Sequence, residues 1–96
     1  MGAERFSTTG SGKTVDDAFD AARDQAFYDY GHSGYSGSLA EKTDFVEISV
    51  PEGQDPEEFA ENLMDNADPR IRDKWGPAGA VLQKHGVWLF FGWASS

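Results

Sequence analysis

The sequence predicts a single α+β domain, residues 1–96, in which two helices pack on one face of a four- to five-stranded, largely antiparallel sheet. The expected order of elements is β-α-(β)-β-α-β-β. Two segments carry apolar residues at helical spacing, and others alternate or concentrate apolar residues as strands do. The chain of 96 residues is long enough for one hydrophobic core and too short for two independent domains.

The N-terminal part is expected to form a short strand and then a long helix. Residues 5–9 alternate apolar and polar side chains, which predicts the strand. Thr14 and Asp17 make a variant of the capping box, and apolar residues then recur at helical spacing over 15–30. Gly31 follows, and glycine readily ends a helix in the left-handed conformation.

A second strand is expected over 45–50, where Val46, Ile48 and Val50 fall on one face. This period-two pattern is typical of a half-buried strand. The segment between the first helix and this strand is rich in glycine and serine. It predicts turns, with at most a short edge strand.

The start of the second helix is signalled by Asp55 at the N-cap and Pro56 at the first helical position. Its buried stripe is expected to extend to Ala67. Asp68 should end the helix, because the residue before a proline, here Pro69, avoids the helical conformation.

The C-terminal part is expected to form a hairpin. Residues 69–75 are predicted to add one more helical turn, and 80–83 and 87–93 are predicted to be strands joined by a turn. Residues 87–93 are apolar on both faces. Such a strand is either central and covered, or it meets a partner, so a homodimer through this aromatic strand is an alternative.

Composition and charge exclude several classes of function. Seventeen acidic and eight basic residues give a formal charge of −9, the wrong sign for direct binding to a nucleic-acid backbone. The chain has no cysteine and no stretch of about 20 apolar residues that could span a membrane. We therefore expect a cytoplasmic protein with no membrane partner and no direct nucleic-acid partner.

Residues 10–14, Gly-Ser-Gly-Lys-Thr, resemble the end of a phosphate-binding P-loop. The full pattern requires a glycine where this chain has Ser7. Asp16 and Asp17 would also bring negative charge to the place where phosphates bind. The sequence therefore favours a turn with Thr14 as a helix cap.

A glycine- and serine-rich loop over 31–38 could instead bind a small ligand or nucleotide, and such a domain could be enzymatic. The candidate ligand-binding side chains are His32, Ser33, Tyr35, Ser36 and Lys42. No paired carboxylates, nucleophile motif or metal-ligand spacing is present, so we expect no catalytic residue, metal or cofactor.

The acidic residues are concentrated on the two expected helices. Twelve of the seventeen lie in or beside them. If both helices cover one face of the sheet, their outer sides form one negative surface. That surface is either only solvated or binds a basic protein. The candidate residues are Asp16, Asp17, Asp20, Asp24, Glu57, Glu58, Glu61 and Asp65.

The segments GHSGYSGSLAEK, KWGPAG and WLFFGWAS resemble parts of small uncharacterised proteins of bacteria, actinobacteria in particular, and of their phages. The resemblance implies no activity and no site residue. It adds weight to a phage-type accessory or inhibitor protein. The leading hypothesis is therefore a non-catalytic interaction protein that presents an acidic helical face to a basic protein partner.

Overall fold

The computed structural model describes residues 3–30 and 38–95, and it confirms the α+β class and the order of elements. A 3-10 turn, η1, takes the place of the extra strand in the described part of the segment before β2. The elements are β1 (Ala3–Ser11), α1 (Val15–Tyr30), η1 (Leu39–Glu41), β2 (Phe45–Glu47), α2 (Pro56–Asp65), β3 (Ala78–Lys84) and β4 (Val87–Ser95).

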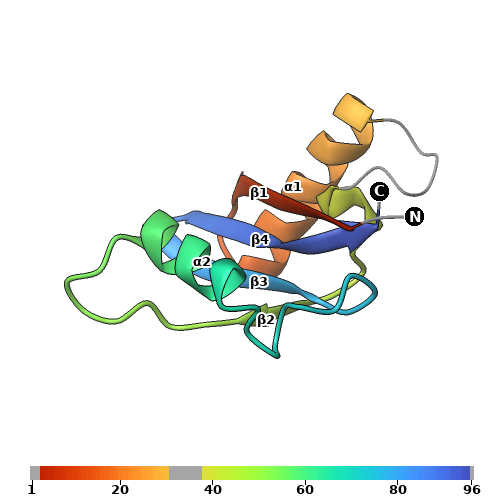
Figure 1. Cartoon of the computed structure of the whole chain (residues 1–96). Coiled ribbons are helices and arrows are strands. Elements are labelled where there is room, and N and C mark those ends of the chain that lie inside the picture. Colours follow the sequence, from red (N-terminus) through yellow and green to blue (C-terminus); the bar gives the residue numbers. More distant parts are fainter. Residues whose placement is uncertain (1–2, 31–37, 96) are drawn as a thin grey trace.

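The strands form one four-stranded sheet in the order β1-β4-β3-β2. β4 pairs antiparallel with both β1 and β3, whereas β2 pairs parallel with β3 because α2 carries the chain back between them. The sheet is therefore mixed, with β4 in its interior and β1 at one edge (Figure 1).

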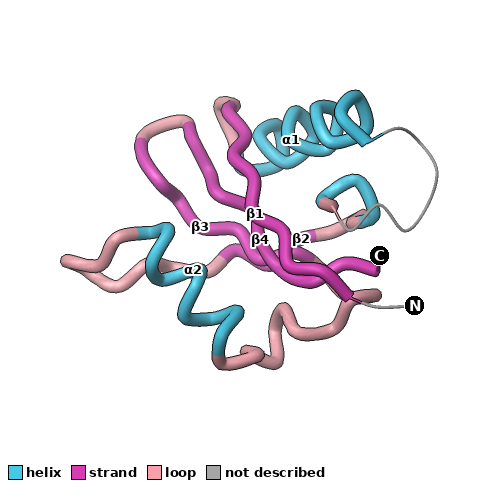
Figure 2. Tube along the Cα trace, turned by 45° about the horizontal axis from the view of Figure 1, so that its top comes forward, coloured by secondary structure: helices cyan, strands magenta, loops and turns pink. Residues whose placement is uncertain are grey.

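The two helices cover opposite faces of this sheet, rather than the single face that the sequence suggested (Figures 1 and 2). Successive side chains of a strand point to opposite faces. In β4, Phe90 joins the cluster under α1, whereas Leu89 and Phe91 join the cluster under α2. The pattern of 87–93, apolar on both faces, is thus that of a covered central strand.

The α1 side of the core is built on aromatic contacts and on a close approach between helix and strand. The ring centroids of Phe19 and Phe90 lie 5.4 Å apart, and that of Phe45 lies 4.9 Å from Phe19. Gly10 of β1 lies directly beneath α1, and a side chain there would clash with the carbonyl oxygen of Ala18. Glycine lets the helix backbone pack against the strand.

Strand lengths differ from the sequence expectation at both edges. β1 spans nine residues, and its register with β4 is unbroken from Ala3 to Ser11. β2 has three residues, although the Ile48 amide still donates to the Ala80 carbonyl at 2.8 Å. Residues 69–75 form turns, and the first of these has the hydrogen bond of a single helical turn, from the Arg72 amide to the Asp68 carbonyl at 3.0 Å.

α2 begins as predicted, with the Asp55 side chain accepting a hydrogen bond from the Glu58 amide at 3.1 Å. It ends earlier than predicted. Ala67, expected in the buried stripe, is exposed and has φ +48°. The amides of Ala67 and Asp68 donate to the carbonyls of Met64 and Leu63, which is the Schellman arrangement.

The side chain of Asp68 then stabilises the turn that follows. Its carboxylate accepts hydrogen bonds from the Arg70 side chain, at 2.9 Å from Nε and 3.0 Å from Nη2. These bonds, with a further one from the Arg70 amide, lower the pKa of Asp68 to about 2. The carboxylate is therefore charged at neutral pH.

Replacing Ala67 with glycine should stabilise the protein. Alanine is strained in the left-handed region and glycine is not, so we expect Ala67→Gly to raise the free energy of unfolding by about 0.5–1 kcal/mol. Urea denaturation measures this change. The same substitution at exposed Ala21, inside α1, should instead lower stability by about 1 kcal/mol. Equal losses at both positions would contradict the assigned helix end.

Candidate functional site

An acidic hollow of about 500 Å³ lies where α2 faces β1. Ser7 of β1 lines it on one side, and residues of the N-cap and of α2 line the other. Four of these carry carboxylates, and none of the described lining residues is a lysine or arginine: Asp55, Glu57, Glu58 and Glu61. All four are exposed to solvent. The hollow therefore has a negative potential and is accessible.

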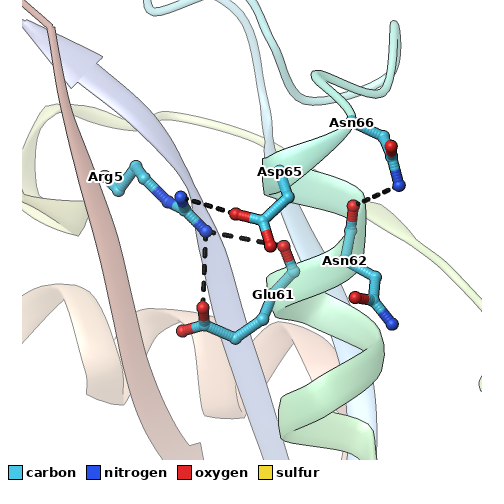
Figure 3. A network of polar contacts seen from close by, with 5 residues as sticks. All are labelled: Arg5, Glu61, Asn62, Asp65 and Asn66. Atoms are coloured by element: carbon cyan, nitrogen blue, oxygen red, sulfur yellow. Dashed lines mark hydrogen bonds and ion pairs between the residues drawn. The ribbon is translucent and has the colours of Figure 1, made fainter.

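Arg5 links β1 to the C-terminal half of α2 (Figure 3). Its Nη1 lies 2.8 Å from Oδ1 of Asp65, and its Nη2 lies 3.4 Å from Oε2 of Glu61. The guanidinium also lies 5.6 Å from the ring centroid of Trp93, within the range of a cation–π contact. Two of the eight predicted partner-binding residues are thus already engaged within the chain.

The N-terminal half of α2 retains more negative charge. Glu57 accepts one hydrogen bond from Gln83 at 3.2 Å, and Asp55 caps the helix. Glu58 makes no side-chain hydrogen bond or ion pair within the described residues. Negative charge at this end is favoured by the helix dipole.

The predicted acidic residues of α1 are exposed on the other side of the molecule. Asp16, Asp17, Asp20 and Asp24 all belong to the helix that covers the opposite face of the sheet. Neighbouring layers of secondary structure lie about 10 Å apart, and salt screens exposed charges over about 8–10 Å. The acidic residues of the two helices therefore form two surfaces, not the single one expected.

Residues 10–14 have a structural role that accounts for their P-loop-like sequence. Ser11 is still part of β1, and the Gly12 amide donates to the Gly86 carbonyl at 3.0 Å. The Thr14 hydroxyl accepts from the Asp17 amide at 3.2 Å, which caps α1. A P-loop needs free amides to surround a phosphate, and here the Gly12 amide is occupied.

Gly10→Ala should lower the free energy of unfolding by about 1–3 kcal/mol, because the added methyl group overlaps the α1 backbone. Chemical denaturation provides the measurement. Ser11→Ala, at an exposed position in the same strand, should change stability by less than about 0.5 kcal/mol. If the free energy of unfolding is the same for Gly10→Ala as for the unmodified protein, the packing of α1 against β1 does not require glycine at this position.

Of the alternative ligand-binding set, the structure describes Lys42 alone. His32, Ser33, Tyr35 and Ser36 lie outside the described residues. Lys42 is described, and it is 2% exposed. Its Nζ donates to the carbonyls of Lys74 and Gly76, each at 2.9 Å. The ammonium therefore holds the loop before β3, and ligand binding by this set stays a prediction.

Lys42→Met should lower the free energy of unfolding by about 1–3 kcal/mol, since it leaves the partly buried carbonyls of Lys74 and Gly76 without their donor. Thermal and urea unfolding measure the loss. Lys84→Met, at an exposed position, is the matched control and should have little effect. If the Lys42→Met protein unfolds at the same free energy as the unmodified protein, Lys42 does not stabilise the loop before β3.

The C-terminal aromatic strand, the predicted homodimer interface, is largely buried within this chain, with Val87, Trp88 and Trp93 half-buried. Phe90 and Phe91 are fully buried, and β4 pairs along both of its edges. A second copy could pair with β4 only by displacing β1 or β3.

A second hollow, of about 360 Å³, was not anticipated from the sequence. It follows the outer side of β1 and is bounded by α1 and by η1. Its lining includes Ser7, which also borders the acidic hollow. The alternation in 5–9 could indicate a strand, but it could not show that this strand lies at the edge of the sheet.

No group of His, Asp or Glu side chains that could hold a metal ion is found within 3–30 and 38–95. Over the same residues, no helix has the length and apolar character of a membrane span. Comparison of the chain with protein-family models, curated proteins and solved structures finds no match. Function can therefore be inferred only from this chain's own residues and their arrangement.

Proposed function

We propose that this protein is a non-catalytic interaction protein that binds a basic surface of a protein partner through the acidic α2 side. The observation that carries the proposal is the 500 Å³ hollow, in which four carboxylates converge and no described lining residue is basic. A lysine or arginine side chain entering it would gain charge-assisted hydrogen bonds. A like-charged surface would be repelled.

The α2 side suits this role better than the α1 side, although both carry acids. The acids of α1 lie on the convex outer surface of a helix, and none of the described hollows includes Asp16, Asp20 or Asp24. Exposed single ion pairs contribute at most about 1 kcal/mol. Convergence of several carboxylates in one hollow is what allows specific binding.

A negative surface of this kind would act first on the rate of association. Charge complementarity steers a basic partner toward the surface, and this effect weakens as salt screens the charges. The net charge of −9 extends the attraction beyond the hollow itself. The resemblance to phage and actinobacterial proteins stays a prediction, and it is compatible with an accessory or inhibitor that acts by such binding.

Neutralising the α2 acids should abolish partner binding. The variant Glu57→Gln/Glu58→Gln/Glu61→Gln removes three charges that line the hollow. The matched control is the triple variant Asp16→Asn/Asp20→Asn/Asp24→Asn on α1. Each triple variant removes three negative charges, so both have a net charge of −6 in place of −9. Pull-down from a bacterial lysate at low and high salt, with recovered proteins identified by mass spectrometry, provides the readout.

We expect the unmodified protein and the α1 triple to recover the same basic proteins at low salt and to lose them at high salt. The α2 triple should recover none of them above background. If the α2 triple variant recovers the same basic proteins as the unmodified protein, the α2 surface is not the binding site. The same conclusion follows if the two triple variants lose these proteins to the same extent.

A further inference from the structure

β1 is an edge strand whose outer side has no strand partner within the described residues. It is nine residues long and extended along its whole length against β4. Edge strands in monomeric proteins are usually protected by shortness, proline or bulges. β1 has no proline, and its pairing with β4 is continuous, without a bulge.

The hydrogen bonding of β1 shows which amides face outward. The Gly12 amide donates to Gly86, so Gly12 points toward the β4 side. In an antiparallel pair the direction alternates along the strand, and the register of β1 with β4 is unbroken. The amides and carbonyls of Ser7 and Thr9 therefore point away from β4, where an additional strand would pair.

The two hollows lie on either side of this edge. The 360 Å³ hollow is lined by the consecutive residues 4–8, which places it along the strand backbone and not over one face alone. Ser7 lines both hollows. An additional strand along β1 would send alternate side chains into the two hollows, because successive residues point to opposite faces.

Both hollows are acidic. Glu4 and Asp29 line the one beside α1, and the α2 acids line the other. Arg5 is the one base among the described residues that line either hollow, and it is paired with Glu61 and Asp65. A second copy of this chain, with its charge of −9, would be repelled from this edge.

We propose that β1 binds an extended, lysine- or arginine-rich segment of a protein partner as an additional strand of the sheet, with alternate basic side chains entering the two acidic hollows. This mode of binding supplies affinity through backbone hydrogen bonds and specificity through alternate side chains. It rests on the proposed function, since it assumes a basic partner, and it adds the edge of the sheet to the α2 surface.

The test uses the whole unmodified chain and two synthetic peptides. In the first peptide, pairs of adjacent lysines are separated by pairs of threonines, so that an extended chain presents lysines on both faces. The second has the same sequence and charge but is N-methylated at every central residue, so neither of its edges can pair as a strand. Binding is measured by fluorescence anisotropy, and amide hydrogen exchange is followed by NMR with and without peptide.

We expect the first peptide to bind at least about tenfold more tightly than the N-methylated one, equivalent to about 1.4 kcal/mol. In its presence, exchange of the Ser7 and Thr9 amides should slow, because they become hydrogen-bonded. The Phe6 and Thr8 amides, already bonded to β4, should change little.

Other outcomes separate this proposal from the one on which it rests. If both peptides bind the unmodified chain equally and neither binds the Glu57→Gln/Glu58→Gln/Glu61→Gln variant, the acidic surface binds basic segments but strand addition is wrong. If neither peptide binds, both proposals fail for this class of ligand. If the Ser7 and Thr9 amides are protected without peptide as the protein concentration rises, and the protein sediments as a dimer, the edge is occupied by a second copy.

A substitution in β1 provides a second test of strand addition. Ser7→Pro removes an outward amide without removing a bond to β4, and proline is tolerated at such edge positions. It should weaken binding of the first peptide about tenfold or more, whereas Ser7→Ala should not. If Ser7→Pro fails to fold, the exchange measurement on the unmodified chain decides the question alone.

Discussion

Phe90 and Phe91 are neighbours in β4, so their side chains point to opposite faces of the sheet, and neither is exposed to solvent. Burial of both requires cover on both faces. α1 supplies it on one side, where Phe19 contacts Phe90, and α2 supplies it on the other. Leaving either ring exposed would cost about 1.5–3 kcal/mol, so these two residues disfavour a fold with both helices on one face.

This three-layer arrangement decides how the negative charge of the chain is distributed. The sheet separates the acids of α1 from those of α2, and screening makes the two groups nearly independent. α2 faces a part of β1 that is not filled by core side chains, and there Ser7 borders the acidic hollow. Arg5 compensates the charge at one end of α2 alone. Charge therefore converges at the N-terminal half of this helix.

Features set by local chemistry could be predicted from the sequence, whereas those set by distant pairing could not. The bounds of α1 and the caps at Thr14 and Asp55 follow from hydrogen bonds between near neighbours. The full length of β1 depends on β4, which is some eighty residues away in the chain. The burial of Lys42 could not be predicted for the same reason: the carbonyls that accept hydrogen bonds from its ammonium come from a distant loop. The acids of the α2 surface were identified from the sequence, but the edge of β1 beside them was not.

The position of the acids within α2 also explains how the fold tolerates them. Four carboxylates gathered in one place repel one another, and of these four only Glu61 has a basic partner among the described residues, Arg5. Asp55, Glu57 and Glu58, however, lie at the N-terminus, where the helix dipole favours negative charge, and Asp55 also satisfies the amide of Glu58. At the other end of the helix the dipole would oppose the same charges, and there Arg5 pairs with the acids. The chain can thus keep a strongly negative surface beside an open strand edge at little cost to its stability.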